Sequence, residues 1–210
     1  MQKEIKKQKI NYDIKLEEII NSLDYRPKVL LHSCCAPCSS AVIERLSEYF
    51  DITILYYNPN IEPYEEYKKR KEEEIRFIKE FNTVNKLDLL DCDYDNDIYH
   101  EVVKGLENEV EGGKRCHKCY KLRLEYTAKK AKELNYDYFG TTLTVSPYKN
   151  SQVLNKIGEE LEGIYNIKYL YSDFKKKNGY KRSIELSKDY NLYRQNYCGC
   201  IYSKRNDIEE

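Results

Sequence analysis

Several features that mark other protein classes are scarce or missing in this sequence. No window approaches the roughly 18 apolar residues that span a bilayer, and the basic N-terminal residues precede no apolar stretch typical of a signal peptide. The first predicted strand is followed by neither G-x-G-x-x-G nor G-x-x-x-x-G-K-[ST], so no dinucleotide or P-loop site is indicated. Tryptophan is absent, and no repeat or Gly/Ser linker occurs. We therefore expect a cytoplasmic protein with no membrane partner.

An excess of either charge is also missing, because 36 Lys and Arg balance 36 Asp and Glu. This balance argues against a polyanion-binding tail, and 40% hydrophobic residues are too many for a disordered chain. Basic residues nevertheless form two local runs, which could be a nucleic-acid surface or simply solvated faces. Tyrosines near the motifs, Tyr148, Tyr180, Tyr193 and Tyr197, could stack on bases. The runs are Lys114, Arg115, Lys118, Lys121 and Arg123, and Lys175, Lys176, Lys177, Lys181 and Arg182.

The hydrophobic pattern alternates between strand and helix periods along the chain. This alternation predicts an α/β fold, with a parallel sheet and helices on both faces. We expect a single domain over 1–210, in which a core at 28–172 precedes a cysteine-rich C-terminal extension at 173–210 that contributes to the site. The predicted strands are 28–32, 51–57, 86–90, 136–142 and 167–171, and the helices are 16–23, 36–50, 64–81, 97–106, 117–134 and 151–161.

The segments that follow the strands carry most of the unusual residues. In a parallel sheet the binding crevice lies outside the carboxyl ends of the strands. We therefore expect these segments to converge in space; they are 32–38, 58–60, 141–149 and 172–174.

Eight cysteines are the most informative entry in the composition. In a cytoplasmic chain they point to metal or redox chemistry rather than to a disulfide framework. Cys34 and Cys35 are adjacent, so their α-carbons lie about 3.8 Å apart, which is too close for an ordinary disulfide. With Cys38 they open a predicted helix, whose N-terminal dipole favours thiolates. The alternative is that these cysteines are small hydrophobic residues in a buried turn.

Cys116 and Cys119 open a second predicted helix. One such pair fits a zinc half-site, a redox pair or a cluster ligand pair. Together with Cys34 and Cys35 they make a set of four thiolates suited to tetrahedral zinc or to a [4Fe–4S] cluster, and spacing alone does not choose between these.

Cys198 and Cys200 are separated only by Gly199. On an extended strand they would lie about 6.7 Å apart, and the glycine permits a bend that brings them closer. A disulfide between them would be strained and therefore reducible. We interpret them as a redox-active pair, with two further metal ligands as the alternative. Cys92 is interpreted as a buried thiol.

With these residues assembled, the chain resembles the QueH-type epoxyqueuosine reductases. The matching motifs cover most of residues 28–202. They are Cys-Cys-Ala-Pro-Cys at 34–38, Tyr-Asn-Pro-Asn-Ile at 57–61, Arg-Cys-His-Lys-Cys-Tyr at 115–120, Thr-Thr-Leu-Thr-Val-Ser-Pro-Tyr-Lys at 141–149, Ser-Asp-Phe-Lys-Lys at 172–176 and Tyr-Arg-Gln-Asn-Tyr-Cys-Gly-Cys at 193–200.

The resemblance implies a Rossmann-like fold of the adenine nucleotide α-hydrolase type. It also implies reduction of the epoxide of epoxyqueuosine, at the wobble position of a tRNA, to give queuosine. An external electron donor is expected, and the absence of a D-x-H-x-x-G motif fits a route without cobalamin. The implied [4Fe–4S] ligands are Cys34, Cys35, Cys116 and Cys119, and the implied redox-active disulfide joins Cys198 and Cys200.

Removing an epoxide oxygen needs an acid at the oxygen and two electrons. As a hypothesis, an iron at the turn of Cys34, Cys35 and Cys38 acts as the Lewis acid, while the cluster and the Cys198–Cys200 dithiol supply electrons. Cys38 and Asp173 could hold a second iron or position a proton donor. The rival functions are a zinc-stabilised tRNA-binding module and a cluster-dependent tRNA thiolation enzyme.

Overall fold

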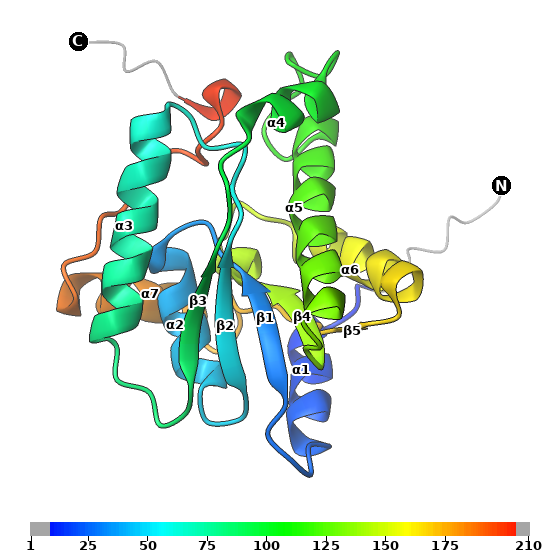
Figure 1. The fold of residues 1–210 in the computed structure, drawn as a ribbon, viewed down its shortest axis with the longest axis vertical. Coiled ribbons are helices and arrows are strands. Elements are labelled where there is room, and N and C mark those ends of the chain that lie inside the picture. Colours follow the sequence, from blue (N-terminus) through cyan, green and yellow to red (C-terminus); the bar gives the residue numbers. More distant parts are fainter. Residues whose placement is uncertain (1–8, 205–210) are drawn as a thin grey trace, which may run out of the picture.

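Five parallel strands form the centre of the molecule, and the computed structural model describes residues 9–204. The strand order is β3-β2-β1-β4-β5, so β1 lies in the middle and pairs with both β2 and β4 (Figure 1). The predicted parallel sheet is confirmed. The strands are β1 Lys28–His32, β2 Asp51–Tyr56, β3 Leu87–Asp91, β4 Tyr138–Thr141 and β5 Lys168–Tyr169.

Helices cover both faces of the sheet, as predicted (Figure 1). Helices α1, α2 and α3 pack on one face, and α7 lies against α2. Helices α5 and α6 pack on the other face, and α4 lies against α5. The helices are α1 Tyr12–Asn21, α2 Ala36–Leu46, α3 Tyr64–Glu80, α4 Asn96–Val103, α5 Lys114–Glu133, α6 Ser151–Tyr165 and α7 Gly179–Asp189, with short 3-10 turns at Thr142–Val145 and Ile201–Ser203.

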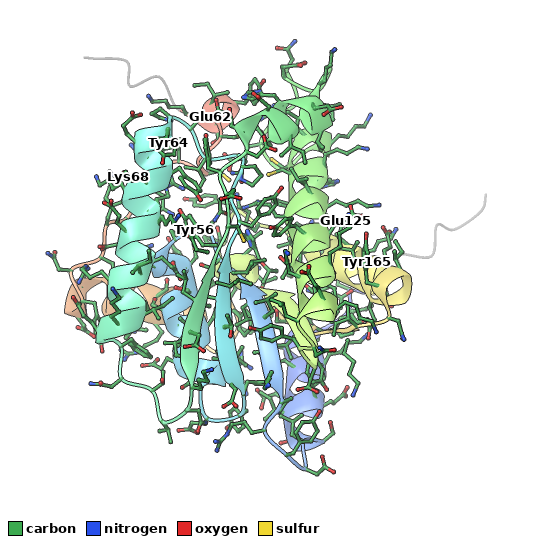
Figure 2. The ribbon with its side chains drawn as sticks, in the orientation of Figure 1. Tyr56, Glu62, Tyr64, Lys68, Glu125 and Tyr165 are labelled. Carbon is green, nitrogen blue, oxygen red and sulfur yellow. The ribbon has the colours of Figure 1, made fainter. Side chains whose placement is uncertain are left out.

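Strand β1 shows why the sequence specifies two packed faces. Its side chains alternate, so that Leu30 joins the core under α5 and α6, whereas Val29 and Leu31 join the core under α2 and α3. A strand buried on both faces is read in the sequence as a continuous apolar run. Figure 2 shows the outer contact of the α5–α6 layer, where the hydroxyl of Tyr165 donates to Oε1 of Glu125 at 2.6 Å.

The largest difference from the sequence prediction lies in the C-terminal extension. It contains α7, which begins at Gly179 and was not predicted. Helix α5 begins at Lys114, three residues earlier than predicted, so that Cys116 and Cys119 both lie inside the helix. Strand β5 has two residues where five were predicted. Residues 205–210 of the predicted extension lie outside the described residues.

Within residues 9–204, no helix has both the length and the apolar character required to cross a bilayer.

Candidate active site

The carboxyl ends of the central strands are tied together by a buried histidine. His32 ends β1, and its ring Nδ1 lies 3.3 Å from Oγ1 of Thr141, which ends β4. Its Nε2 lies 3.2 Å from Oδ1 of Asn58, in the segment after β2. Burial, and then the charge of Arg123, lower the pKa of His32 to about 3, so the ring is neutral at neutral pH. The predicted convergence of these segments is confirmed.

The segment after β5 also reaches this edge of the sheet. The hydroxyls of Thr144 and Ser172 lie 3.2 Å apart. The neighbouring carboxylate of Asp173 accepts from the hydroxyl of Ser151 at 2.9 Å and pairs with Nζ of Lys175 at 2.9 Å. Asp173, Ser151 and Lys175 together line a surface pocket beside the site. Asp173 does not line the separate cavity whose wall includes Cys34, Cys38 and Cys198.

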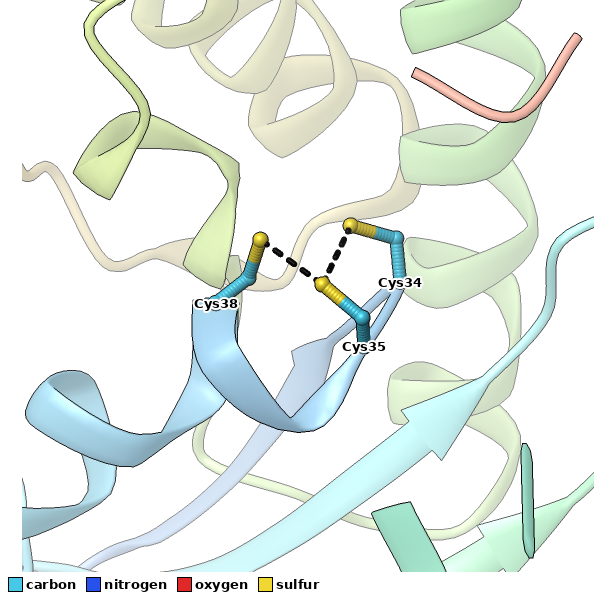
Figure 3. Close-up of side chains that lie close together, drawn as sticks. All are labelled: Cys34, Cys35 and Cys38. Carbon is cyan, nitrogen blue, oxygen red and sulfur yellow. Dashed lines mark hydrogen bonds between the residues drawn. The ribbon is translucent and has the colours of Figure 1, made fainter. Parts of the chain in front are cut away.

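Three thiols meet at the junction of β1 and α2, and we call Cys34, Cys35 and Cys38 the cysteine turn (Figure 3). The sulfurs of Cys34 and Cys35 lie 3.7 Å apart, and the thiol of Cys35 donates to the sulfur of Cys38 at 2.9 Å. Cys35 is the N-cap of α2, so the turn lies at the positive end of the helix. All three sulfurs lie within 4.8 Å of one another, which suits shared binding of a metal ion.

Within the cysteine turn, the surroundings of Cys34 favour its thiolate form over its thiol form. Hydrogen bonds from Cys35 and Cys38, together with the nearby charge of Arg123, hold the pKa of Cys34 well below its usual value. Burial instead raises the pKa of Cys35 well above its usual value. The side-chain amide of Gln195 donates to the sulfur of Cys35 at 2.8 Å, which links the turn to the C-terminal segment.

The remaining motif cysteines form a second set, and we call Cys116, Cys119, Cys198 and Cys200 the four-cysteine group. Cys119 and Cys200 pack in one buried cluster, and Cys198 and Cys200 both influence the ionisation of Cys116 and Cys119. Burial raises the pKa of Cys116, and it raises that of Cys119 to about 12. The thiols of Cys116 and Cys119 are therefore neutral at neutral pH unless a metal binds them.

The four predicted ligands are divided between the two sets of thiols. Cys34 and Cys35 lie with Cys38, whereas Cys116 and Cys119 lie with the C-terminal pair. The two sets are still neighbours, because Cys34, Cys35 and Cys116 belong to one buried cluster. The buried Arg123 also interacts electrostatically with thiols of both sets.

The disulfide predicted between Cys198 and Cys200 is absent, since all eight cysteines are free thiols among the described residues. The two side chains have different partners. The sulfur of Cys198 lies 2.9 Å from Nζ of Lys149, and Cys200 packs against Tyr99.

A cavity of about 210 Å³ connects the two sets of thiols. Its wall includes Cys34 and Cys38 from the cysteine turn and Cys198 from the four-cysteine group. Tyr148 and Tyr180 also line the cavity, and Tyr148 is 72% exposed. A substrate that entered this cavity would meet thiols and an aromatic ring in one place.

Several residues of the site were not assigned a role from the sequence. Arg70 on α3 is buried, donates to the carbonyls of Cys198 (3.2 Å) and Tyr197 (3.4 Å), and pairs with Glu66 at 2.6 Å. It fixes the backbone of the C-terminal segment. In the sequence Arg70 lies in a highly charged helix, where nothing distinguishes it from exposed neighbours.

Glu74, one turn further along α3, is fully buried below the cysteine turn. Its Oε2 accepts from the hydroxyl of Ser33 at 3.4 Å. Burial raises the pKa of Glu74 to about 8, so the carboxyl is mainly protonated at neutral pH.

The first predicted basic run is only partly available to a nucleic acid. Arg115 and Arg123 are buried, and Arg115 donates to the backbone carbonyls of Leu106 and Glu107. The prediction of a surface role is therefore wrong for these two arginines. In the second run, Lys177 pairs with Glu17 and Arg182 pairs with Glu44. The exposed lysines of the two runs are Lys114, Lys118, Lys121, Lys176, Lys177 and Lys181.

Known proteins with similar sequences share these motifs. A sequence model of the family "Epoxyqueuosine reductase QueH" matches residues 29–206. The chain belongs to this family. It is 48% identical over 206 residues to epoxyqueuosine reductase QueH of Staphylococcus epidermidis, covering 95% of this chain and 87% of the relative. The family member from Thermotoga maritima is 35% identical, over 83% of this chain and 89% of that protein. The family resemblance and the expected oxidoreductase class are confirmed.

Solved structures with low sequence identity share the fold. The U34-tRNA thiolase NcsA from Methanococcus maripaludis, solved with its [4Fe–4S] cluster, superposes with a TM-score of 0.55 at 13% identity, covering 92% of this chain and 67% of the thiolase. A predicted tRNA methyltransferase subunit from Methanocaldococcus jannaschii gives 0.50 at 17% identity, covering 79% and 76%. The predicted α/β fold is thereby confirmed.

Proposed function

We propose that this protein reduces the epoxide of epoxyqueuosine, at the wobble position of a tRNA, to the alkene of queuosine. Membership of the QueH family supports the substrate and the reaction class. The observation that carries the proposal is the cavity, because Cys34, Cys38 and Cys198 all line it. Removal of an epoxide oxygen needs a reductant next to the substrate, and a wall of thiols can provide or bind one.

The reaction is proposed to depend on a [4Fe–4S] cluster and not on cobalamin. The proposed ligands are Cys34, Cys35, Cys116 and Cys119, which are buried near the charge of Arg123. The donor chemistry fits, since the close group of possible ligands at the turn consists of thiols alone, and thiolates suit iron–sulfur clusters. When bound, such a cluster would supply single electrons.

Cys38 is the third thiol of the turn and lines the cavity. We propose it as the ligand of a second iron or as a proton donor to the substrate oxygen. Asp173 is a weaker partner in either role, because its carboxylate is bound to Ser151 and Lys175. The proposed electron store is the dithiol of Cys198 and Cys200, which an external donor would keep reduced.

The tRNA is proposed to enter over the exposed ring of Tyr148. Aromatic side chains stack on unpaired bases, and Tyr180 lines the same cavity. Lys176 and Lys181 on the adjoining segment are exposed and could contact phosphates.

The decisive experiment is an anaerobic assay with epoxyqueuosine-containing tRNA, a chemical reductant and no added cobalamin. The expected result is loss of one oxygen atom from the modified nucleoside, measured by mass spectrometry. A zinc-stabilised binding module would give a colourless protein and no product. A thiolation enzyme would require ATP and add sulfur. A protein purified anaerobically with iron and inorganic sulfide that leaves the epoxide intact would refute the proposed reaction.

A further inference from the structure

A buried arginine on the wall of the cavity has few partners for its hydrogen-bond donors. Arg123 on α5 is only 1% exposed, and its side chain lines the cavity of about 210 Å³. Among the described residues, its hydrogen bonds are limited to the one that Nε donates to the carbonyl of Cys119 at 3.4 Å, and Nη2 has no partner. A guanidinium carries five N–H donors, and burying such donors unpaired costs free energy. The position of Arg123 therefore points to a ligand.

The other two cationic side chains that line the cavity in the described part of the chain are better provided for. Nζ of Lys149 lies 2.9 Å from Sγ of Cys198. Nη1 of Arg194 donates to the carbonyl of Ser183 at 3.3 Å, and this arginine is exposed, so water can bind its remaining donors. Arg123 is thus the cation of the wall whose donors are left for a molecule in the cavity.

Arg123 borders both the thiols and the space that a substrate can enter. Of the four proposed cluster ligands, only Cys34 lines the cavity, whereas Arg123 lines it beside Cys34 and Cys38. The apolar side chains of Leu143 and Val145 lie on the same wall. A hydrogen bond from a charged donor is stronger in such low-dielectric surroundings than in water. An oxygen atom of a substrate would therefore be held firmly by this guanidinium.

We propose that Arg123 donates a hydrogen bond to the epoxide oxygen and stabilises the negative charge that this oxygen gains as its first C–O bond breaks. This inference rests on the proposed reductase function. Charge that develops on an oxygen during a reaction is stabilised most by donors that are already in place. Because a guanidinium stays protonated, Arg123 binds the oxygen and does not transfer a proton to it.

The overall reaction remains balanced with Arg123 in this role. Conversion of the epoxide to an alkene breaks both C–O bonds of the ring, consumes two electrons and two protons, and releases the oxygen as water. The electrons come from an external low-potential donor, for which dithionite stands in the assay, and the protons come from the solvent. The guanidinium is unchanged at the end of the cycle.

A comparison of two tRNAs tests the contact by binding alone. The probes are the same tRNA carrying either epoxyqueuosine or queuosine, which lacks the oxygen that Arg123 would contact. Affinities are measured anaerobically by fluorescence anisotropy, with the metal-loaded protein and no reductant, so that no turnover occurs. Wild type should bind the epoxyqueuosine tRNA more tightly by about tenfold or more. Arg123→Met should weaken this binding to the level of the queuosine tRNA, whose own affinity should hardly change.

Arg194→Met is the matched control, because Arg194 lines the same cavity but has an exposed guanidinium that can contact both tRNAs alike. It should leave the ratio of the two affinities unchanged. Arg123→Lys keeps a cation on a shorter side chain and should lower the ratio less than Arg123→Met does, which gives a second measurement if the methionine variant does not fold. Circular dichroism and iron content show that each variant is folded and loaded.

The inference is overturned if wild type binds the two tRNAs equally, or if folded and loaded Arg123→Met keeps the wild-type ratio. It is also overturned if Arg123→Met keeps that ratio and changes only the iron–sulfur absorbance, because Arg123 would then serve the cluster. A wild-type protein that shows the expected ratio and forms no queuosine with dithionite would refute the reductase proposal and leave the contact of Arg123 with the oxygen standing.

Discussion

The cysteine turn and the four-cysteine group are built in opposite ways. The turn gathers Cys34, Cys35 and Cys38 within one strand-to-helix junction, so local backbone geometry alone places their sulfurs within 4.8 Å. The four-cysteine group combines the start of α5 with a C-terminal segment that has little regular structure. Its geometry depends on long-range contacts, chiefly those of Arg70 with the backbone of residues 197 and 198.

The two sets also differ in their electrostatic surroundings. The turn lies over the carboxyl of Glu74, which is protonated at neutral pH, and shares the influence of Arg123. The four-cysteine group is faced by two buried cations, Lys149 and Arg123. Of the proposed cluster ligands, Cys34 and Cys35 therefore lie in a locally fixed turn, whereas Cys116 and Cys119 lie in the tertiary assembly that also contains Cys198 and Cys200.

The largest effect is expected from Cys35→Ser, which removes a proposed ligand from the turn. We expect loss of the iron–sulfur absorbance and a fall in epoxyqueuosine reduction of about a thousandfold or more. Iron and sulfide analysis and the anaerobic tRNA assay measure both. Cys92→Ser is the control, because Cys92 lies outside both sets of thiols. Full iron content in Cys35→Ser would show that the turn does not hold the cluster.

Arg70→Met should disrupt the four-cysteine group by releasing the backbone of residues 197 and 198. It leaves Glu66 and two backbone carbonyls without their buried partner, which costs about 3–5 kcal/mol of unfolding free energy. Because Arg70 donates a hydrogen bond to none of the four proposed cluster ligands, iron–sulfur absorbance should remain while turnover falls by about a hundredfold. Lys68→Met, at a position 62% exposed on the same helix, is the control (Figure 2). Equal loss of absorbance and turnover would mean that the two sets are not separable.

The difference between local and long-range construction also explains which features of the site can be predicted from the sequence. The cysteine turn was recognisable, because a buried strand, three cysteines and a helix start are consecutive in the chain. The sheet and the convergence of its loops were predictable for a similar reason, since hydrophobic periods and strand polarity are local properties. Helix α7 was missed because its sequence is polar on average and two of its three buried residues, Ser183 and Ser187, are serines.

Contacts between distant segments were not predictable. Arg70 and Glu74 lie in a helix of mostly exposed charges, and only the fold shows that these two side chains point inward. Lys149 ends the 141–149 motif, but nothing near it in the sequence indicates its contact with Cys198, which is remote in the chain. The grouping of Cys116 and Cys119 with Cys198 and Cys200 was likewise hidden, since spacing does not report which helix starts are neighbours.

A smaller effect is expected from Gly199→Ala, which strains only the link between the paired thiols. The φ of +122° is unfavourable for alanine, and the added Cβ would lie 3.0 Å from Cγ1 of Ile61 and 3.1 Å from Nη1 of Arg70. We expect a loss of about 1–3 kcal/mol of unfolding free energy. Gly163→Ala in α6 is the control, because nothing lies within 4 Å of its Cβ position. It should stabilise the protein by about 0.5–1 kcal/mol. Equal unfolding curves for both variants would contradict the strained geometry.

The smallest effect, on pH dependence alone, is expected from Glu74→Gln below the cysteine turn. The pKa of Glu74 is raised from 4.5 to about 8 by burial, so the folded protein keeps this proton while the unfolded chain loses it. The contribution of Glu74 is therefore fully present below pH 4.5 and is lost as the pH rises through about 8. Glutamine has no such titration, so the stability of the variant relative to wild type should increase across this window.

Chemical denaturation at several pH values measures this difference in unfolding free energy, with exposed Glu72→Gln as the control. Parallel pH curves for wild type and Glu74→Gln would mean that Glu74 ionises as an ordinary surface carboxylate, and the electrostatic contrast between the two sets of thiols would then rest on Lys149 alone.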